Sequence, residues 1–175
     1  MRPRQREKVL ASMFERGQSL FWLTTVFRSE TFAHGRYGNR AVSEEDRLLS
    51  AAELDRVTEI MLTRYRTADP KTLLAGPRLL SVLFAWRQGG DEVGPKTWVD
   101  EQIETPEGLV DVLEGMASIR VGNRGSTSIL SEENVGPFID RDAARERLAK
   151  ISTVQGPLKE RAARLVRMLA AGEDR

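Results

Sequence analysis

The segment between residues 77 and 88 constrains the fold more than any other part of the chain. Gly76 precedes this segment, Pro77 is its first residue, and Gly89-Gly90 follows it. Apolar side chains occupy most of the positions within it: Leu79, Leu80, Val82, Leu83, Phe84 and Trp86. Proline favours the first helical position and glycine the position after the last, so we predict a helix here. A helix that is apolar on most sides is normally buried. We therefore expect this helix at the centre of the fold.

The neighbouring segments carry helical signals of their own. Ser50-Ala51-Ala52-Glu53 has the spacing of a capping box, in which serine and glutamate satisfy first-turn amides reciprocally. Capping residues followed by proline mark two further starts, at Asp69-Pro70 and Thr105-Pro106. The same reasoning predicts helices at Arg4 to Arg16, from Pro95, after Asp140 or Asp142, and from Pro157. We therefore expect an all-α fold, an irregular bundle of about seven to nine helices.

Three segments do not follow this simple pattern. Residues 19–27 are rich in aromatic and β-branched side chains, which suit a strand or a helix. We predict a helix, because a lone strand would have no ladder to join. Residues 34–40 are expected to form a loop, since two glycines and an asparagine interrupt any period. If the chain contains one short strand or hairpin, we expect it between residues 121 and 139, in and after a second glycine-rich loop.

Length and composition indicate a single helical domain over residues 1–175. There is no cysteine, so disulfides and thiolate metal ligands are excluded. The longest apolar stretch, Leu20 to Phe27, is far shorter than the ~20 residues of a membrane-spanning helix. The basic start at Met1 to Arg6 is not followed by the apolar core of a signal peptide. We expect an unprocessed, cytoplasmic protein.

Charge is nearly balanced overall, with a formal net charge of +1, but it is unevenly distributed. The net charge is about +5 over residues 1–40, about −7 over residues 91–115 and about +5 over residues 141–171. The near-neutral total gives no general attraction to polyanions, whereas the basic ends would suit phosphate contacts. Nucleic acid is therefore a less favoured partner than protein.

The motifs of common enzymes are absent from the sequence. No glycine-rich loop ends in lysine and a hydroxyl residue, as a phosphate-binding P-loop requires, and no dinucleotide fingerprint occurs. His34 is the only histidine, and nothing in its spacing from Ser19 or Ser29 indicates a catalytic triad. We expect no catalytic residue, no metal site and no cofactor, so the chain by itself is not an enzyme. Acidic runs at Glu44 to Asp46 and Asp100 to Glu104 are interpreted as solvated faces, and Trp22, Trp86 and Trp98 as core residues.

The two predicted loops share the tripeptide Gly-Asn-Arg, at residues 38–40 and 122–124. Consecutive amides beside an arginine can bind an anion, although glycine and asparagine also serve simply to make turns. The first loop adds further donors and an aromatic ring. The candidates for an anion or partner contact are His34, Arg36, Tyr37, Arg40 and Arg124.

The order of motifs between residues 52 and 151 resembles a known family. The motifs are Glu53-Leu54-Asp55-Arg56-Val57, then Leu83-Phe84-Ala85-Trp86-Arg87-Gln88-Gly89-Gly90, Lys96-Thr97-Trp98-Val99, Gly108-Leu109-Val110-Asp111-Val112-Leu113, and the helix from Asp140-Arg141-Asp142 to Leu148. This order is similar to the helical region that follows the ATPase core in KAP-family P-loop NTPases, over about 100 of the 175 residues. The chain departs from the family in lacking the P-loop and the acidic magnesium-binding strand, so no catalytic residue carries over.

The resemblance implies a domain that packs on a nucleotide-hydrolysing core or signals from it, in a prokaryotic defence or membrane-associated setting. It implies that residues 1–175 are either an accessory domain excised from a larger NTPase or a stand-alone protein whose partner supplies the ATPase. Our leading hypothesis is a noncatalytic helical accessory or regulatory domain that docks on a P-loop ATPase domain in cis or in trans. The alternative is a nucleic-acid-binding helical module that uses the basic terminal helices and the Gly-Asn-Arg loops.

Overall fold

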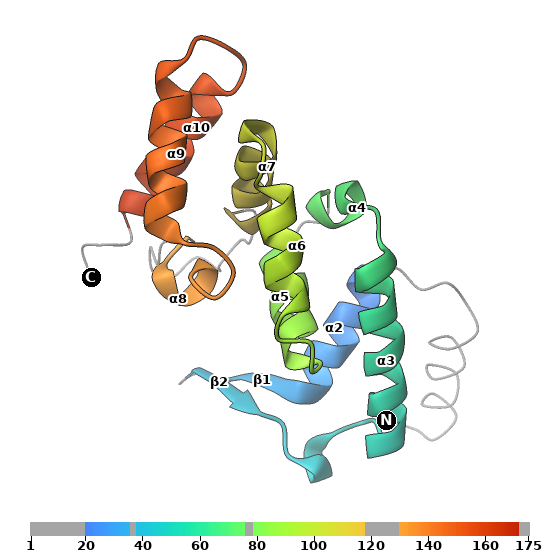
Figure 1. The fold of residues 1–175 in the computed structure, drawn as a ribbon. Coiled ribbons are helices and arrows are strands. Elements are labelled where there is room, and N and C mark those ends of the chain that lie inside the picture. The colour runs from blue at the N-terminus through green and yellow to red at the C-terminus, as the bar shows by residue number, and fades with distance from the viewer. Residues whose placement is uncertain (1–19, 36–37, 76–78, 118–129, 172–175) are drawn as a thin grey trace. The chain divides into compact units, whose positions relative to one another are not determined.

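The computed structural model in Figure 1 describes residues 20–35, 38–75, 79–117 and 130–171. The predicted helix from Arg4 to Arg16 and the second Gly-Asn-Arg loop lie outside these ranges. Contacts between residues divide the chain into two compact units, Met1–Thr67 and Ala68–Arg175, and each unit is described by itself below. The expectation of one domain stays a prediction.

The described residues form an all-α fold, as expected, to which one short hairpin is added. Unit 1 contains α2 (Leu20–Thr31), β1 (Phe32–Gly35), β2 (Gly38–Ala41), the 3₁₀ helix η1 (Glu44–Asp46) and α3 (Ala51–Thr67). Unit 2 contains α4 (Pro70–Leu74), α5 (Leu79–Gln88), α6 (Gly94–Gln102), α7 (Pro106–Ala117), α8 (Glu132–Val135), α9 (Arg141–Thr153) and α10 (Lys159–Ala170). No helix within the described ranges is both long and apolar enough to cross a membrane.

The apolar segment at residues 19–27, which suited a strand or a helix, lies in α2 from Leu20 onward, so the prediction of a helix is confirmed. In unit 1, α2 packs against α3. The two helices bury apolar side chains at three- and four-residue spacing: Leu23 and Phe27 from α2, and Leu54, Val57, Met61 and Tyr65 from α3. The hydroxyl groups of Thr24 and Tyr65 share a buried hydrogen bond between the helices. Burial, opposed by that bond and by the charge of Arg28, raises the pKa of Tyr65 far above its usual value. Tyr65 therefore stays neutral and holds the two helices together.

The predicted loop at residues 34–40 was wrong, because β1 and β2 pair there as an antiparallel hairpin. Phe32 lies opposite Ala41, and Gly35 lies opposite Gly38, so two residues connect the strands. Short hairpin connections favour glycine, and here the glycines that seemed to exclude regular structure flank the connection. The strand expected between residues 121 and 139 is not found in the described part of that range, residues 130–139, where α8 lies.

In unit 2, α5 is buried on most sides, which confirms its predicted central position. It packs against α4, α6 and α7. Gly115 of α7 lies so close to Leu79 that an added Cβ atom would stand 3.1 Å from its Cδ2 atom. The α9–α10 pair packs on α7, with Leu148, Leu165 and Leu169 in the core.

The predicted capping residues start several of these helices. The side chain of Asp69 accepts a hydrogen bond from the Lys71 amide at 2.9 Å, and that of Asp140 accepts one from the Ala143 amide at 3.0 Å. Ser50 and Glu53 form the expected reciprocal pair, in which the Ser50 amide donates to Glu53 at 2.7 Å. The last helix begins at Lys159, two residues later than predicted, because a turn in which the Lys159 amide donates to the Gly156 carbonyl precedes it.

Candidate functional site

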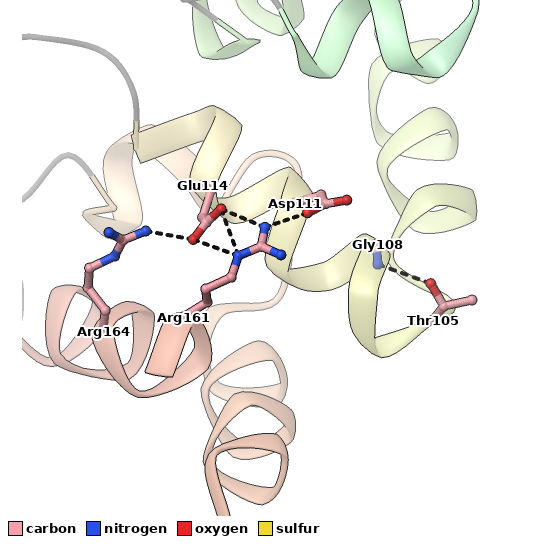
Figure 2. Close-up of polar contacts among 6 residues, drawn as sticks. All are labelled: Thr105, Gly108, Asp111, Glu114, Arg161 and Arg164. Atoms are coloured by element: carbon pink, nitrogen blue, oxygen red, sulfur yellow. Dashed lines mark hydrogen bonds and ion pairs between the residues drawn. The ribbon is translucent and has the colours of Figure 1, made fainter. Parts of the chain in front are cut away.

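A cluster of four charged side chains joins α7 to α10 in unit 2 (Figure 2). Asp111 and Glu114 lie three residues apart on α7, and Arg161 and Arg164 lie three residues apart on α10. Residues at this spacing share one flank of a helix. The neighbouring flanks are apolar and buried, through Leu113 of α7 and Leu165 of α10 among others. The two helices therefore meet through apolar side chains and carry the charged cluster at the edge of their contact.

Arg161 makes most of the contacts in this cluster. Its Nη2 atom donates to Asp111 Oδ1 at 2.6 Å and to Glu114 Oε2 at 2.7 Å, and its Nε atom lies 3.2 Å from both oxygens of Glu114. Arg164 Nη2 donates to Glu114 Oε1 at 2.6 Å. Figure 2 shows both guanidinium groups converging on Glu114. One carboxylate therefore holds two arginines of α10.

The electrostatics of the cluster favour the charged forms of Glu114 and Arg161. The hydrogen bond from Arg161 lowers the pKa of Glu114 below its usual 4.5, with further contributions from Arg164, while partial burial opposes them. The bonds to Glu114 and Asp111 raise the pKa of Arg161. A carboxylate that is ionised at neutral pH and occupied by two cations suits the joining of helices better than proton transfer.

Two arginines of α9 extend this pattern by binding the carboxyl ends of other helices. Arg141 Nη2 donates to the Leu169 carbonyl near the end of α10 at 2.7 Å, and Arg147 Nη2 donates to the Ile103 carbonyl after α6 at 2.6 Å. The last carbonyls of a helix lack partners within the helix, and basic side chains satisfy them. Much of the basic charge at residues 141–171 is therefore used inside unit 2.

This charged cluster was missed by the sequence analysis, although a signal for it was present. The acidic region at residues 91–115 and the basic region at residues 141–171 were recognised as opposite in charge. What was missing was the packing of α7 on α10, which decides that Asp111 and Glu114 meet Arg161 and Arg164. Their spacing of three residues on each helix could have indicated matching flanks.

Two of the five predicted contact residues, His34 and Arg40, lie in the β1–β2 hairpin. His34 is in β1, opposite Asn39, and Arg40 is in β2, opposite Ala33. The structure thus brings His34 and Arg40 to neighbouring positions of one hairpin. Arg36, Tyr37 and Arg124 lie outside the described residues.

A buried carboxylate that the sequence analysis did not single out joins the end of α2 to the chain that follows the hairpin and η1. Glu30, at the end of α2, is 5% exposed, and its Oε2 atom accepts hydrogen bonds from the amides of Leu48 and Leu49 at 2.8 and 2.9 Å. Glu30 follows Leu23 and Phe27 on the buried stripe of α2. A carboxylate at a core position of an amphipathic helix is the signal that could have identified it.

The other polar candidates behave largely as expected. Glu44 to Asp46 form η1 and are exposed, and so are Asp100, Glu101 and Glu104. Trp86 and Trp98 are buried, whereas Trp22 is half-buried. Trp86 Nε1 donates to Asp91 at 2.9 Å, so this indole has a structural partner. Among the residues that the structure describes, no group of three or more metal-ligating side chains was found.

The fold and the cluster define a helical region whose described polar groups mainly join helices and the segments between them. No model of a known protein family matches the chain, and no solved structure matches it. Among curated proteins, the chain is similar to the phage T7 exclusion protein of Escherichia coli strain K12, with 31% identity over 137 residues. The match covers 77% of this chain but 18% of that protein, so the chain spans less than a fifth of its relative.

Proposed function

We propose that the chain is a noncatalytic helical accessory region of a larger P-loop NTPase, which docks on the nucleotide-hydrolysing part and acts in the exclusion of bacteriophage. The observation that carries this proposal is the match to the phage T7 exclusion protein, because most of that relative lies beyond the matched region. A region of this size within a much longer protein has a large neighbour to dock on. We place its action in the cytoplasm.

The P-loop part of the proposal rests on the motif order between Ala52 and Ile151, which resembles the helical region of KAP-family NTPases. These motifs fall on α3, α5, α6, α7 and α9. These motifs contain apolar core residues and the residues that start helices. They therefore support the role of a helical scaffold. The nucleotide would be bound by residues outside this chain.

The contacts of unit 2 support a docking role. The α9–α10 pair is joined to α7 by the Arg161 cluster, and Arg147 ties α9 to the end of α6. Surfaces that are held by several charge-assisted bonds lose little conformational entropy on binding. Unit 2 is therefore suited to present a preformed surface to a protein partner.

The alternative function, a nucleic-acid-binding module that uses the basic terminal helices, receives less support. Arg161 and Arg164 are paired with Asp111 and Glu114, and Arg141 and Arg147 are bound to carbonyls. Basic groups that are paired with carboxylates or bound to carbonyls within the protein are less available for phosphate contacts. The last two helices are therefore poorer candidates for a nucleic-acid surface than their charge alone indicates.

The docking is tested with two separately purified parts of the longer protein to which, on this proposal, the chain belongs: this chain and the remainder. We expect an equimolar complex in analytical ultracentrifugation, with a dissociation constant that changes when ATP and Mg²⁺ are added. A remainder that binds neither ATP nor the chain would contradict the proposal.

The role in exclusion is tested by plating phage T7 on cells that produce the longer protein. We expect the wild-type protein to reduce plaque formation and the variant Arg161→Glu, which places a third carboxylate beside Asp111 and Glu114, to restore it. Arg87→Glu, at an exposed position of α5, is the matched control and should retain exclusion. Equal plating on all three strains and on cells without the protein would rule out this role.

A further inference from the structure

We draw no further inference here: the strongest candidate, the exposed surface patch around α6 (Glu92, Val93, Asp100, Glu101 and Glu104), is a cluster of acidic side chains beside one exposed valine, and nothing in the described part of the chain shows what covers it.

Discussion

Arg161 of α10 binds both Asp111 and Glu114 of α7, and it shows how much a partly exposed ion pair contributes. Its side chain is 39% exposed, so solvent screens part of its attraction to Asp111 and Glu114. Isolated surface pairs contribute about 0–1 kcal/mol, whereas hydrogen-bonded networks contribute more. The cluster therefore adds modest stability, and its main effect is to set the orientation of α10 on α7.

The substitution Arg161→Gln removes the cation that two carboxylates share. We expect it to lower the free energy of unfolding by about 1 kcal/mol, since Glu114 keeps Arg164 while Asp111 loses its partner. Urea denaturation at low and high salt measures this loss, which should shrink as salt screens the cluster. Arg167→Gln serves as the control, with an expected change within about 0.5 kcal/mol. A loss for Arg161→Gln that does not depend on salt would show that packing, not charge, is responsible.

The lowered pKa of Glu114 predicts how stability depends on pH. A carboxyl group whose pKa is lower in the folded than in the unfolded state stabilises the protein above the unfolded pKa, and that contribution is lost as pH falls through the folded pKa. The usual value is 4.5, so the loss begins near that pH and continues below it. Thermal unfolding from pH 6 downward should show a smaller acid slope for Glu114→Gln than for wild type. Identical slopes would mean that other carboxylates dominate the acid transition.

At the scale of elements, helices with local signals were predictable and the hairpin was not. Asp69 and Asp140 cap helices through hydrogen bonds to amides two or three residues away, so these caps can be predicted from the neighbouring residues in the sequence. The hairpin forms by pairing of β1 with β2, and the Glu30 carboxylate binds the following chain through amides 18 and 19 residues away. Composition around Gly35 and Gly38 indicates a turn, but the strands on either side have no period of their own.

The link from α2 to the chain after η1 can be tested through Glu30. Replacement by alanine leaves the part-buried amide of Leu48 and the buried amide of Leu49 without their acceptor, and an unsatisfied buried amide typically costs about 1–3 kcal/mol. We expect Glu30→Ala to accelerate hydrogen exchange at these two amides before it affects the amides of α3. The exposed Glu59→Ala on α3 is the control and should leave exchange at residues 48 and 49 unchanged. Unaltered protection in Glu30→Ala would exclude Glu30 as the acceptor that protects these amides.

The central position of α5 gives a prediction about its core. Leu83 is fully buried, so Leu83→Ala leaves a cavity and should lower the free energy of unfolding by about 2–5 kcal/mol. Arg87→Ala, on the same helix but exposed, should change it by less than about 0.5 kcal/mol. Chemical denaturation of both variants measures the difference. Equal effects of the two substitutions would contradict a buried α5.

At the scale of the whole molecule, the charge pattern has a structural explanation that the sequence did not reveal. The acidic middle and the basic end are far apart in sequence, yet Asp111 and Glu114 bind Arg161 and Arg164 within unit 2. The opposite regions therefore complete one scaffold and are less available to distant partners. The candidate contacts at Arg36, Tyr37 and Arg124 stay predictions, because they lie outside the described residues.

The phage T7 exclusion protein is much longer than this chain. The match covers 18% of the phage T7 exclusion protein, and we propose that the much longer region beyond it contains an ATPase core. We infer that the helices transmit the state of a nucleotide bound elsewhere. Such coupling requires that the chain interact differently with the two states of its neighbour.

The most direct measurement is the rate of ATP hydrolysis by the remainder of the longer protein, with this chain titrated in trans. The account predicts a turnover rate that changes with the concentration of the chain and reaches a plateau, and a weaker response to the Arg161→Glu variant. A hydrolysis rate that is the same at every concentration of the chain would contradict the proposal that it is an accessory region of an NTPase.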